Sequence, residues 1–545
     1  MSAPPMVSRR EWRWVAAVTL GLLLVSLVPF VYCYLVPGRP WQFMGFTENQ
    51  GDQNLYLMFA RQAQDGHLLF ANYFTPEPSR HLLFNLVWLI VGWISRLTTL
   101  RLDYSYHIVR ILAGALWFFV LYRFIAIFLS SRLERRAAFL LIAAGAGLGW
   151  AYAELRFIPT SPDIMRQYTY PADLWIPEAF SFFSLFRGPN FLLPLTLMAA
   201  VYAYLLRAVR TDRTRYAVAA GALCVVLGFV RVYDVISVVV IGAVFVAALW
   251  LGGKAPVRVL RHMVVVAALA APVLIYHAWA LVWSGALPGW GGASVEWRSP
   301  SPVSYLVGFG LLLLAFGSLG WLRRWRQLTA AEILLIVWLV VNLALVYSGS
   351  VLRVERRLVS GWQIPMGILT AAVVLRDIGE RFRQQKRAVL AAVVVGLSLL
   401  TSVLTCWRNT EVARRPPGIP SYLHAEEAAA YHYLNGKVTE QDVVLAGRPT
   451  AVLIPRLTGA RTFLAHSEVT VDVRQKILDF VQFVDAGTPD QWRRDFLRRW
   501  GITWFYWGDQ EAIPNMPLFN PLEKPYLVHR FSDSRVALYS VDLSR

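Results

Sequence analysis

Twelve apolar runs, separated by short polar segments, dominate the first 406 residues. They lie at 12–36, 81–98, 105–129, 137–152, 190–208, 216–231, 235–251, 262–284, 303–322, 331–348, 360–376 and 388–406. About 18 consecutive apolar residues mark a candidate transmembrane helix, and several of these runs approach or exceed that length. Only 16% of the 545 residues are charged, against about 25% in typical soluble domains. The sequence therefore predicts a mainly α-helical, multi-pass membrane protein.

Six clusters of basic residues fall between these runs and predict the topology. They are Arg9, Arg10 and Arg13; Arg132, Arg135 and Arg136; Arg207, Arg210, Arg213 and Arg215; Lys254, Arg258 and Arg261; Arg323, Arg324 and Arg326; and Arg376, Arg381, Arg383, Lys386 and Arg387. The positive-inside rule places all six in the cytoplasm. An even number of crossings must then separate Arg13 from Arg132, although three runs lie between them.

One of those three runs must therefore stay on one side of the membrane. We predict that 81–98, which is short and contains Arg96, lies along the outer surface as a juxtamembrane helix. This leaves about eleven transmembrane helices, a cytoplasmic N-terminus and an extracytoplasmic C-terminus. The alternative is that 81–98 spans the membrane and one basic loop breaks the rule.

The charge pattern and the three cysteines indicate neither a nucleic-acid-binding protein nor a protein built on a cysteine metal site or a disulfide framework. The net charge is +19. Because the basic residues cluster beside apolar runs and no nucleic-acid-binding motif is present, we expect no nucleic-acid partner. Cys33, Cys224 and Cys406 have neither metal-site nor disulfide-framework spacing. The first run has no small-residue cleavage site before or after it, so we expect a retained helix rather than a cleaved signal peptide.

The segment after the last run has the pattern of a separate α/β domain. A proline-rich stretch at 414–420 marks the boundary, so residues 1–406 are predicted to form the membrane domain, with outer loops 37–104 and 153–189. Residues 407–545 are predicted to form a small extracytoplasmic α/β domain. Helices are expected at 425–436, 473–487 and 490–501, and strands at 442–447, 502–508 and 535–542. This tail has no phosphate-binding loop or nucleophile elbow, so we expect it to bind an acceptor or to cover a site in the membrane domain.

Several short motifs give the chain a family resemblance. GDQNLY at 51–56 with ARQAQDG at 60–66 is similar to the D-x-x-x-Y stretch in the first outer loop of GT-C glycosyltransferases. Arg110 resembles an arginine that opens their next span, and 177–197, 229–238 and 444–470 resemble segments of uncharacterised bacterial members. At 75–88 the chain lacks the His-Pro-Pro-Leu motif found there in the family.

The resemblance implies a membrane enzyme of the bacterial inner (plasma) membrane. Such an enzyme transfers a hexose or pentose, with inversion, from a polyprenyl-phosphate donor to an extracytoplasmic glycan, lipid or protein acceptor. Membrane lipids would surround it. Nucleotide sugars are disfavoured as donors, because they are cytoplasmic whereas the acidic candidates are predicted outside.

Asp52 is the main catalytic candidate. It follows the first predicted span closely, where a lipid-linked donor and a polar acceptor both have access. A carboxylate there can remove the acceptor proton as the glycosidic bond forms, or hold a divalent cation (Mg²⁺, Mn²⁺ or Ca²⁺) that organises the donor phosphate. The alternative is an N-cap, because Asp52 immediately precedes a segment with helical character.

Further site candidates come from the outer loops and the outer ends of spans. Asp173 and Glu178 lie in the second outer loop and could share an acceptor or a metal with Asp52, although Glu178 also suits an ordinary helix start. Guanidinium groups bind phosphate oxygens bidentately, and the candidates for the donor phosphate are Arg110, Arg187, Arg231, Arg353, Arg356 and Arg357. The alternatives are a local ion pair between Arg231 and Asp234, and pairing of the last three with Glu355 or acidic outer loops. The candidates for sugar or acceptor contacts are Tyr56, His81, Tyr170 and Trp175, and interfacial aromatics are the alternative.

Two other functions fit a chain of this kind. One is a transporter or flippase for a lipid-linked saccharide, although no internal repeat with paired broken helices is evident. The other is a non-catalytic assembly factor. Replacing Asp52 by Asn separates them, because only an enzyme would lose turnover while keeping its fold.

Overall fold

The computed structural model describes residues 7–38, 40–154, 170–254, 256–284, 298–349, 354–379, 384–414 and 417–545. The chain forms two compact units, each assembled from distant parts of the sequence. The helical unit comprises Met1–Val28, His107–His277 and Glu296–Arg408. The mixed unit comprises Pro29–Tyr106, Ala278–Val295 and Asn409–Arg545. The predicted tail domain thus belongs to one unit with the first predicted outer loop.

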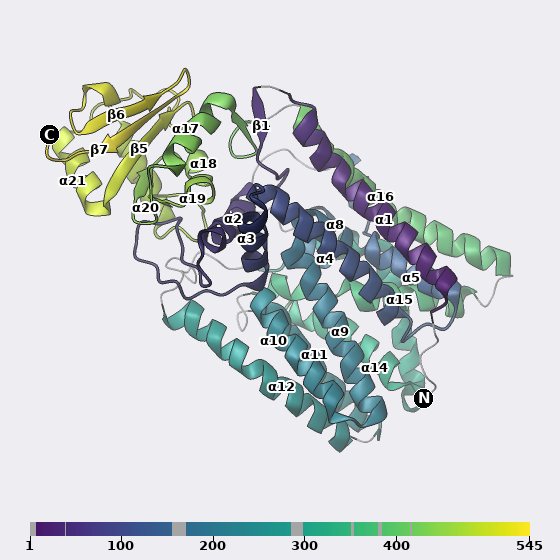
Figure 1. The fold of residues 1–545 in the computed structure, drawn as a ribbon. Coiled ribbons are helices and arrows are strands. Elements are labelled where there is room, and N and C mark those ends of the chain that lie inside the picture. The colour runs from purple at the N-terminus through teal and green to yellow at the C-terminus, as the bar shows by residue number, and fades with distance from the viewer. Residues whose placement is uncertain are drawn as a thin grey trace. The chain divides into compact units, whose positions relative to one another are not determined.

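Helices, several of them long and apolar, make up most of the helical unit, and some extend beyond the sequence limits of this unit (Figure 1). They are α1 (Arg9–Leu35), α4 (Leu102–Ile125), α5 (Arg132–Ala143), α6 (Gly149–Glu154), α8 (Ser181–Arg187), α9 (Pro189–Thr211), α10 (Thr214–Val230), α11 (Val232–Leu251), α12 (Pro256–Ala278), α13 (Pro302–Phe309), α14 (Ala330–Leu345), α15 (Gln363–Ala372) and α16 (Gln384–Arg414). The 3₁₀ or π segments of the helical unit are η1 (Ala172–Leu174), η2 (Pro177–Ala179), η4 (Gly310–Gln327), η6 (Glu355–Val359) and η7 (Val373–Ile378), whereas η3 (Trp279–Trp283) belongs to the mixed unit.

Eight helices in the described part of the chain are long and apolar enough to cross a membrane. Three more, α3 (Leu86–Thr98), α10 and α14, are apolar but shorter. With its 13 residues, α3 is about 20 Å long, well short of the roughly 30 Å hydrocarbon core. This length agrees with a helix that does not span. The total of eleven spans stays a prediction.

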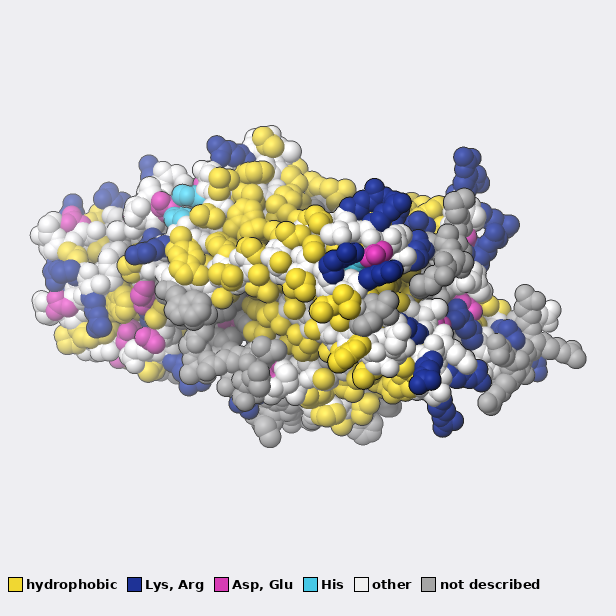
Figure 2. Space-filling model, turned by 90° about the horizontal axis from the view of Figure 1, so that it is seen from below, with side chains coloured by type: hydrophobic (Ala, Val, Ile, Leu, Met, Phe, Trp, Pro, Cys, Tyr) yellow, Lys and Arg dark blue, Asp and Glu magenta, His cyan; other side chains and the backbone are white. Residues whose placement is uncertain are grey.

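Exposed apolar side chains distinguish these helices from those of a soluble bundle. Figure 2 shows a broad, continuous hydrophobic area on one face of the molecule. The exposed residues include Leu112, Leu116, Val218, Val257 and Val264. A soluble protein rarely exposes so large an apolar surface, whereas lipid chains cover it in a membrane. The protein is a multi-pass membrane protein.

A buried ion pair holds the beginning of α1 against α5. Arg135 Nη2 lies 2.6 Å from Glu11 Oε1, and the Tyr122 hydroxyl donates to the same carboxylate oxygen at 2.9 Å. A buried carboxylate must be paired in this way, because an isolated charge in the interior is strongly unfavourable.

The predicted run 137–152 is interrupted in the structure. Helix α5 ends at Ala143, and the next residues turn away from the helix axis. Their backbone N–H groups bond to other segments, Ala146 to Ser398 O at 2.7 Å and Leu148 to Val307 O at 2.9 Å. A Cβ atom on Gly147 would lie 2.1 Å from Gly308 O. This close backbone approach explains the glycine and ends the helix.

The mixed unit contains the tail domain and two helices of the first predicted outer loop. Helix α2 (Gln50–Asp65) packs on α3, and a Cβ atom on Gly92 would lie 2.3 Å from Ala60 O. The other elements are β1 (Trp41–Phe43), β2 (Tyr422–His424), α17 (Ala425–Asn435), β3 (Val443–Leu445), α18 (Arg448–Ala451), α19 (Ile454–Thr458), β4 (Arg461–Thr462), α20 (Val473–Val484), α21 (Asp490–Trp500), β5 (Ile502–Gly508), η9 (Pro521–Glu523), β6 (Leu527–Ser532) and β7 (Val536–Val541).

These elements confirm the prediction of an α/β tail. The sheet has the order β4-β3-β5-β7-β6, and β3 is parallel to β4 and β5. Strand β7 is antiparallel to its neighbours β5 and β6 (Figure 1). Its core is rich in aromatic side chains, including Phe463, Phe483 and Phe505. A second, two-stranded sheet joins β1 to β2 in antiparallel register, with Gln42 opposite Leu423. The first predicted outer loop is therefore hydrogen-bonded to the tail.

Candidate active site

Asp52 lies in the first turn of α2, but it is not the N-cap. The N-cap is Asn49, whose φ of 51° is in the left-handed region, and its side-chain amide donates to Asp52 Oδ2 at 2.6 Å. The N-cap alternative for Asp52 is therefore wrong, because the helix begins three residues earlier than the sequence pattern indicated. A carboxylate in the first turn still benefits from the positive end of the helix dipole.

The second hydrogen bond to Asp52 comes from His466, in the loop after β4. His466 Nε2 lies 3.0 Å from Asp52 Oδ1. The other ring nitrogen, Nδ1, accepts the backbone N–H of Glu468 at 3.1 Å, so the ring proton must be on Nε2 and is donated to Asp52. Both ring nitrogens of His466 are therefore engaged in hydrogen bonds.

The position of the His466 ring is fixed by packing. The ring is 5% exposed and stacks on Phe74, with centroids 6.2 Å apart and planes 7° from parallel. On the other side, a Cβ atom on Gly51 would lie 3.2 Å from the ring, so glycine leaves room for it. The Asp52 side chain is 21% exposed. His466 is therefore held in place by packing and hydrogen bonds, and Asp52 is the more exposed member of the pair.

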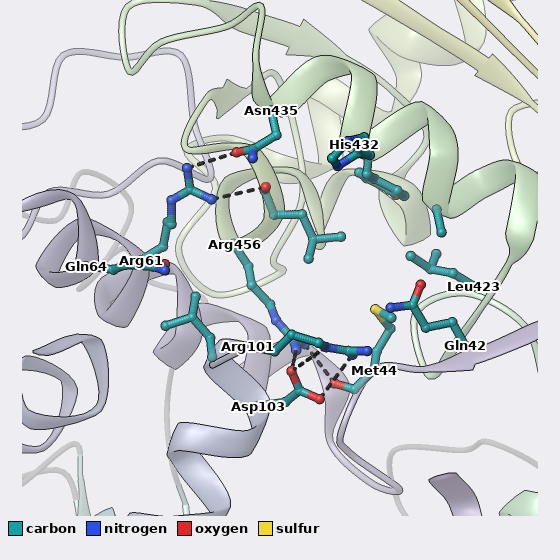
Figure 3. A pocket seen from close by; sticks show the side chains of 14 residues that line it. Gln42, Met44, Arg61, Gln64, Arg101, Asp103, Leu423, His432, Asn435 and Arg456 are labelled. Atoms are coloured by element: carbon teal, nitrogen blue, oxygen red, sulfur yellow. Dashed lines mark hydrogen bonds and ion pairs between the residues drawn. The ribbon is translucent and has the colours of Figure 1, made fainter. Parts of the chain in front are cut away.

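A pocket of about 310 Å³ in the same unit has an excess of positive charge (Figure 3). Arg101 Nη2 and Arg456 Nη2 contact the two oxygens of Asp103 at 3.1 and 3.3 Å. Arg61 lies across the pocket and donates to Asn435 Oδ1 at 2.9 Å. Arg61 also pairs with Asp65 at 2.9 Å, so three guanidinium groups stand against two carboxylates, and the remaining positive charge suits an anionic ligand such as a phosphate.

In the helical unit, the structure brings together five of the predicted site residues. Glu178 Oε1 lies 3.2 Å from Arg231 Nη2 and also pairs with Arg357. The Arg356 guanidinium lies 5.1 Å from the ring centroid of Trp175. Burial would raise the pKa of Glu178, but the arginines outweigh it and hold this pKa at about 2. The result is a compact group of arginines, one ionised carboxylate and an aromatic ring.

Two of the alternative interpretations are also confirmed here. Arg231 Nε lies 3.6 Å from Asp234 Oδ2, which is the local ion pair that the sequence suggested. Arg357 pairs with Glu178, which joins the basic segment and an acidic loop that were both predicted to lie outside. Arg353 lies outside the described residues.

Asp173 has the contacts of a structural carboxylate. Its Oδ2 accepts the backbone N–H groups of Gly147 and Gly149 at 3.1 and 3.0 Å, and its side chain is buried. Burial raises the pKa of Asp173 to about 7. These contacts hold the turn that follows α5, and a catalytic role for Asp173 stays an untested prediction.

The remaining predicted site residues each contact a different neighbouring residue. Arg110 is buried within the membrane span α4 and donates to Leu185 O at 3.0 Å. Arg187 lies over the Phe183 ring at 5.2 Å. The Tyr170 carbonyl accepts from Trp175 Nε1 at 3.1 Å. In the mixed unit, Tyr56 stacks on Trp88 with centroids 4.6 Å apart.

His81 lies in a cluster that the sequence did not reveal. Among the described residues, three metal-ligating side chains converge only at His67, His81 and Glu440, whose ligand atoms all lie within 4.8 Å of one another. Asp52 is not in this group, so a cation at Asp52 stays a prediction. His466 was also missed, and so were Arg61, Arg101 and Arg456. The only available signal was the presence of histidine and arginine in segments of otherwise apolar character.

Solved structures of three membrane enzymes resemble this chain over most of its length. The oligosaccharyltransferase of Archaeoglobus fulgidus, tethered with an acceptor peptide, matches with a TM-score of 0.54 and 9% identity, covering 91% of this chain and 69% of its own. ArnT from Cupriavidus metallidurans, bound to undecaprenyl phosphate, matches with a TM-score of 0.51 and 13% identity over 98% of both chains. The arabinofuranosyltransferase AftD from Mycobacteria matches with a TM-score of 0.56 and 16% identity over 99% of this chain and 40% of its own.

No family model and no curated protein sequence matches the chain. At these identities the likeness establishes the fold. The chain therefore shares its fold with these three solved structures, which agrees with the GT-C resemblance seen in its first loop.

Proposed function

We propose that this protein is a membrane glycosyltransferase that transfers a sugar from a polyprenyl-phosphate donor to an extracytoplasmic acceptor, with Asp52 as general base. The single observation that carries the proposal is the hydrogen bond between His466 and Asp52 within a chain of GT-C fold. The structural neighbours support the substrate classes, since one is bound to undecaprenyl phosphate and another is tethered with an acceptor peptide.

The chemistry follows from what the Asp52 carboxylate can accept. Asp52 accepts hydrogen bonds from His466 at Oδ1 and from Asn49 at Oδ2, and a carboxylate, with about four lone-pair sites, can also accept a hydrogen bond from an acceptor hydroxyl. As the acceptor oxygen bonds to the anomeric carbon, its proton passes to Asp52. The bond from that carbon to the phosphate oxygen breaks, and the polyprenyl phosphate leaves with the electron pair.

The test is turnover by the full chain in lipid nanodiscs with a set of polyprenyl-phosphate sugars. Asp52→Asn should lower kcat by at least about 100-fold, the usual contribution of a general base, with KM and thermal stability near those of the wild type. The matched control is Asp495→Asn on the exposed face of α21, which should leave kcat unchanged. Unchanged kcat in Asp52→Asn would exclude Asp52 as the general base, whereas a wild type without turnover on any of these donors would favour the flippase or assembly-factor alternatives.

The same assay separates a general base from a metal ligand. If Asp52 acts alone, treatment of the wild type with a chelator leaves kcat unchanged. Loss of turnover after chelation, with recovery on adding Mg²⁺, Mn²⁺ or Ca²⁺, would instead assign Asp52 to a cation.

A further inference from the structure

Three side chains far from one another in the sequence meet in the mixed unit away from the Asp52–His466 pair. His67 directly follows the Gly66 C-cap of α2, His81 precedes α3, and Glu440 lies between α17 and β3. A backbone bridge brings the two histidines together, because Phe70 N–H donates to Leu83 O at 2.7 Å and closes the loop between them.

The donor atoms of these side chains point to one position. His67 Nε2 lies 3.3 Å and His81 Nε2 lies 3.7 Å from the same oxygen of Glu440, Oε2. The two imidazole rings are stacked, with centroids 4.5 Å apart and planes 13° from parallel. All three side chains are about one third exposed, so an ion can reach them from solution.

The spacing and chemistry fit a particular class of metal ion. Ligands about 2.0–2.1 Å from a tetrahedral Zn²⁺ ion are separated by roughly 3.4 Å, which is close to both nitrogen–oxygen distances. Two imidazoles and one carboxylate suit Zn²⁺, whereas Mg²⁺ and Ca²⁺ prefer oxygen ligands alone.

A neighbouring tyrosine orients the carboxylate. The Tyr73 hydroxyl donates to Glu440 and lies 3.1 Å from His81 Nε2. The tyrosine thus holds the Glu440 carboxylate beside the two histidines, as outer-shell partners do at metal sites.

We propose that His67, His81 and Glu440 bind one Zn²⁺ ion, with water in the fourth position, and that the ion ties the segment after α2 to the loop between α17 and β3. The site is independent of the proposed transfer reaction, because neither Asp52 nor His466 contributes a ligand. Its role is to hold the first predicted outer loop onto the tail domain.

The experiment uses the full chain in nanodiscs, without a histidine tag and after treatment with EDTA. Zn²⁺ is added, and bound metal is measured by mass spectrometry after desalting. Co²⁺ serves as a spectroscopic probe, because its visible absorption reports tetrahedral coordination. The wild type should bind one ion per chain and show a higher unfolding temperature with Zn²⁺. His67→Gln, His81→Gln and Glu440→Gln should each weaken binding by at least about 100-fold, and Tyr73→Phe by about 10-fold, since outer-shell partners alone contribute about 10–100-fold.

Two matched controls make the result specific. His529→Gln changes an exposed histidine on β6 and should bind Zn²⁺ like the wild type. Asp52→Asn should also bind Zn²⁺ normally, so failure of the proposed catalysis and failure of this site are distinguishable. The proposal is overturned if the wild type binds no stoichiometric Zn²⁺, or if folded Glu440→Gln and His67→Gln bind it as tightly as His529→Gln.

Discussion

His466 donates a hydrogen bond from Nε2 to Oδ1 of Asp52, across 414 residues of sequence. The ring cannot turn to act on a substrate itself, because its Nδ1 holds the backbone N–H of Glu468 and its face packs on Phe74. We therefore propose different roles for the two residues, with His466 orienting the carboxylate and Asp52 acting on the substrate.

His466→Phe tests this division of tasks. The variant removes the donor but keeps a ring, and a hydrogen bond to a charged group contributes about 1.5–3 kcal/mol, so kcat should fall roughly 10–100-fold. KM and the unfolding temperature should change little. His466→Gln retains an N–H donor and should recover part of kcat. A purely structural role would instead lower stability in both variants and leave kcat of the folded fraction intact.

Glu178→Gln should destabilise the helical unit. The substitution removes the buried carboxylate that pairs with Arg231 and Arg357, and breaking a buried pair typically lowers the free energy of unfolding by about 3–5 kcal/mol. Thermal unfolding of Glu178→Gln, Arg357→Met and the double variant measures the coupling free energy between the two side chains. If the effects of the two single substitutions on the free energy of unfolding add up in the double variant, the ion pair is contradicted.

The pKa of Glu178 also predicts an acid limit for stability. In the folded state this pKa is about 2, below the ordinary value of 4.5. The stabilisation is therefore complete above pH 4.5 and is lost as the pH falls from 4.5 towards 2. Unfolding temperatures recorded across this range should fall for the wild type and change less for Glu178→Gln.

Asp173→Asn should keep turnover and change the pH dependence in the opposite direction. Because the folded-state pKa of Asp173 is raised from 3.8 to about 7, its protonated form stabilises the fold, and this contribution is lost as the pH rises from about 4 to 7. The variant should flatten that loss in unfolding measurements. A folded Asp173→Asn protein without turnover would support the catalytic role predicted from the sequence.

Substitutions of Tyr56 distinguish packing from contact with a sugar. The ring stacks on Trp88 with planes only 9° apart, so Tyr56→Phe should retain both stability and turnover. Tyr56→Ala should lower the free energy of unfolding by about 0.5–3 kcal/mol, the common range for lost packing. Loss of kcat in Tyr56→Phe without loss of stability would indicate that the hydroxyl contacts the substrate.

The sequence predicted the features that depend on local pattern. Apolar length gave the long helices, and alternation with turn residues gave α17, α20, α21, β3, β5 and β7 close to their observed bounds. The apolar pattern failed for α5, because close packing of Gly147 on Gly308 interrupts an otherwise apolar run. This packing depends on a segment about 160 residues away in the sequence.

The candidate site was predictable only in part, for the same reason. Asp52, Glu178 and the nearby arginines stand beside span ends, where charged side chains are conspicuous. His466 and Glu440 do not stand beside an apolar run in the tail sequence, so nothing marks them there. Only the fold shows that His466 contacts Asp52 and that Glu440 contacts residues 67 and 81.

The pairing of β1 with β2 has a consequence for biosynthesis. Gln42 faces Leu423 in that small sheet, so the N-terminal partner is synthesised hundreds of residues before its complement leaves the ribosome. Until then its backbone groups have no strand to bond, and the early segment must wait beside the translocon for the end of the chain. Maturation of this protein is therefore a late, post-insertional event, and nascent chains stopped after the last membrane helix would carry an unfinished N-terminal segment.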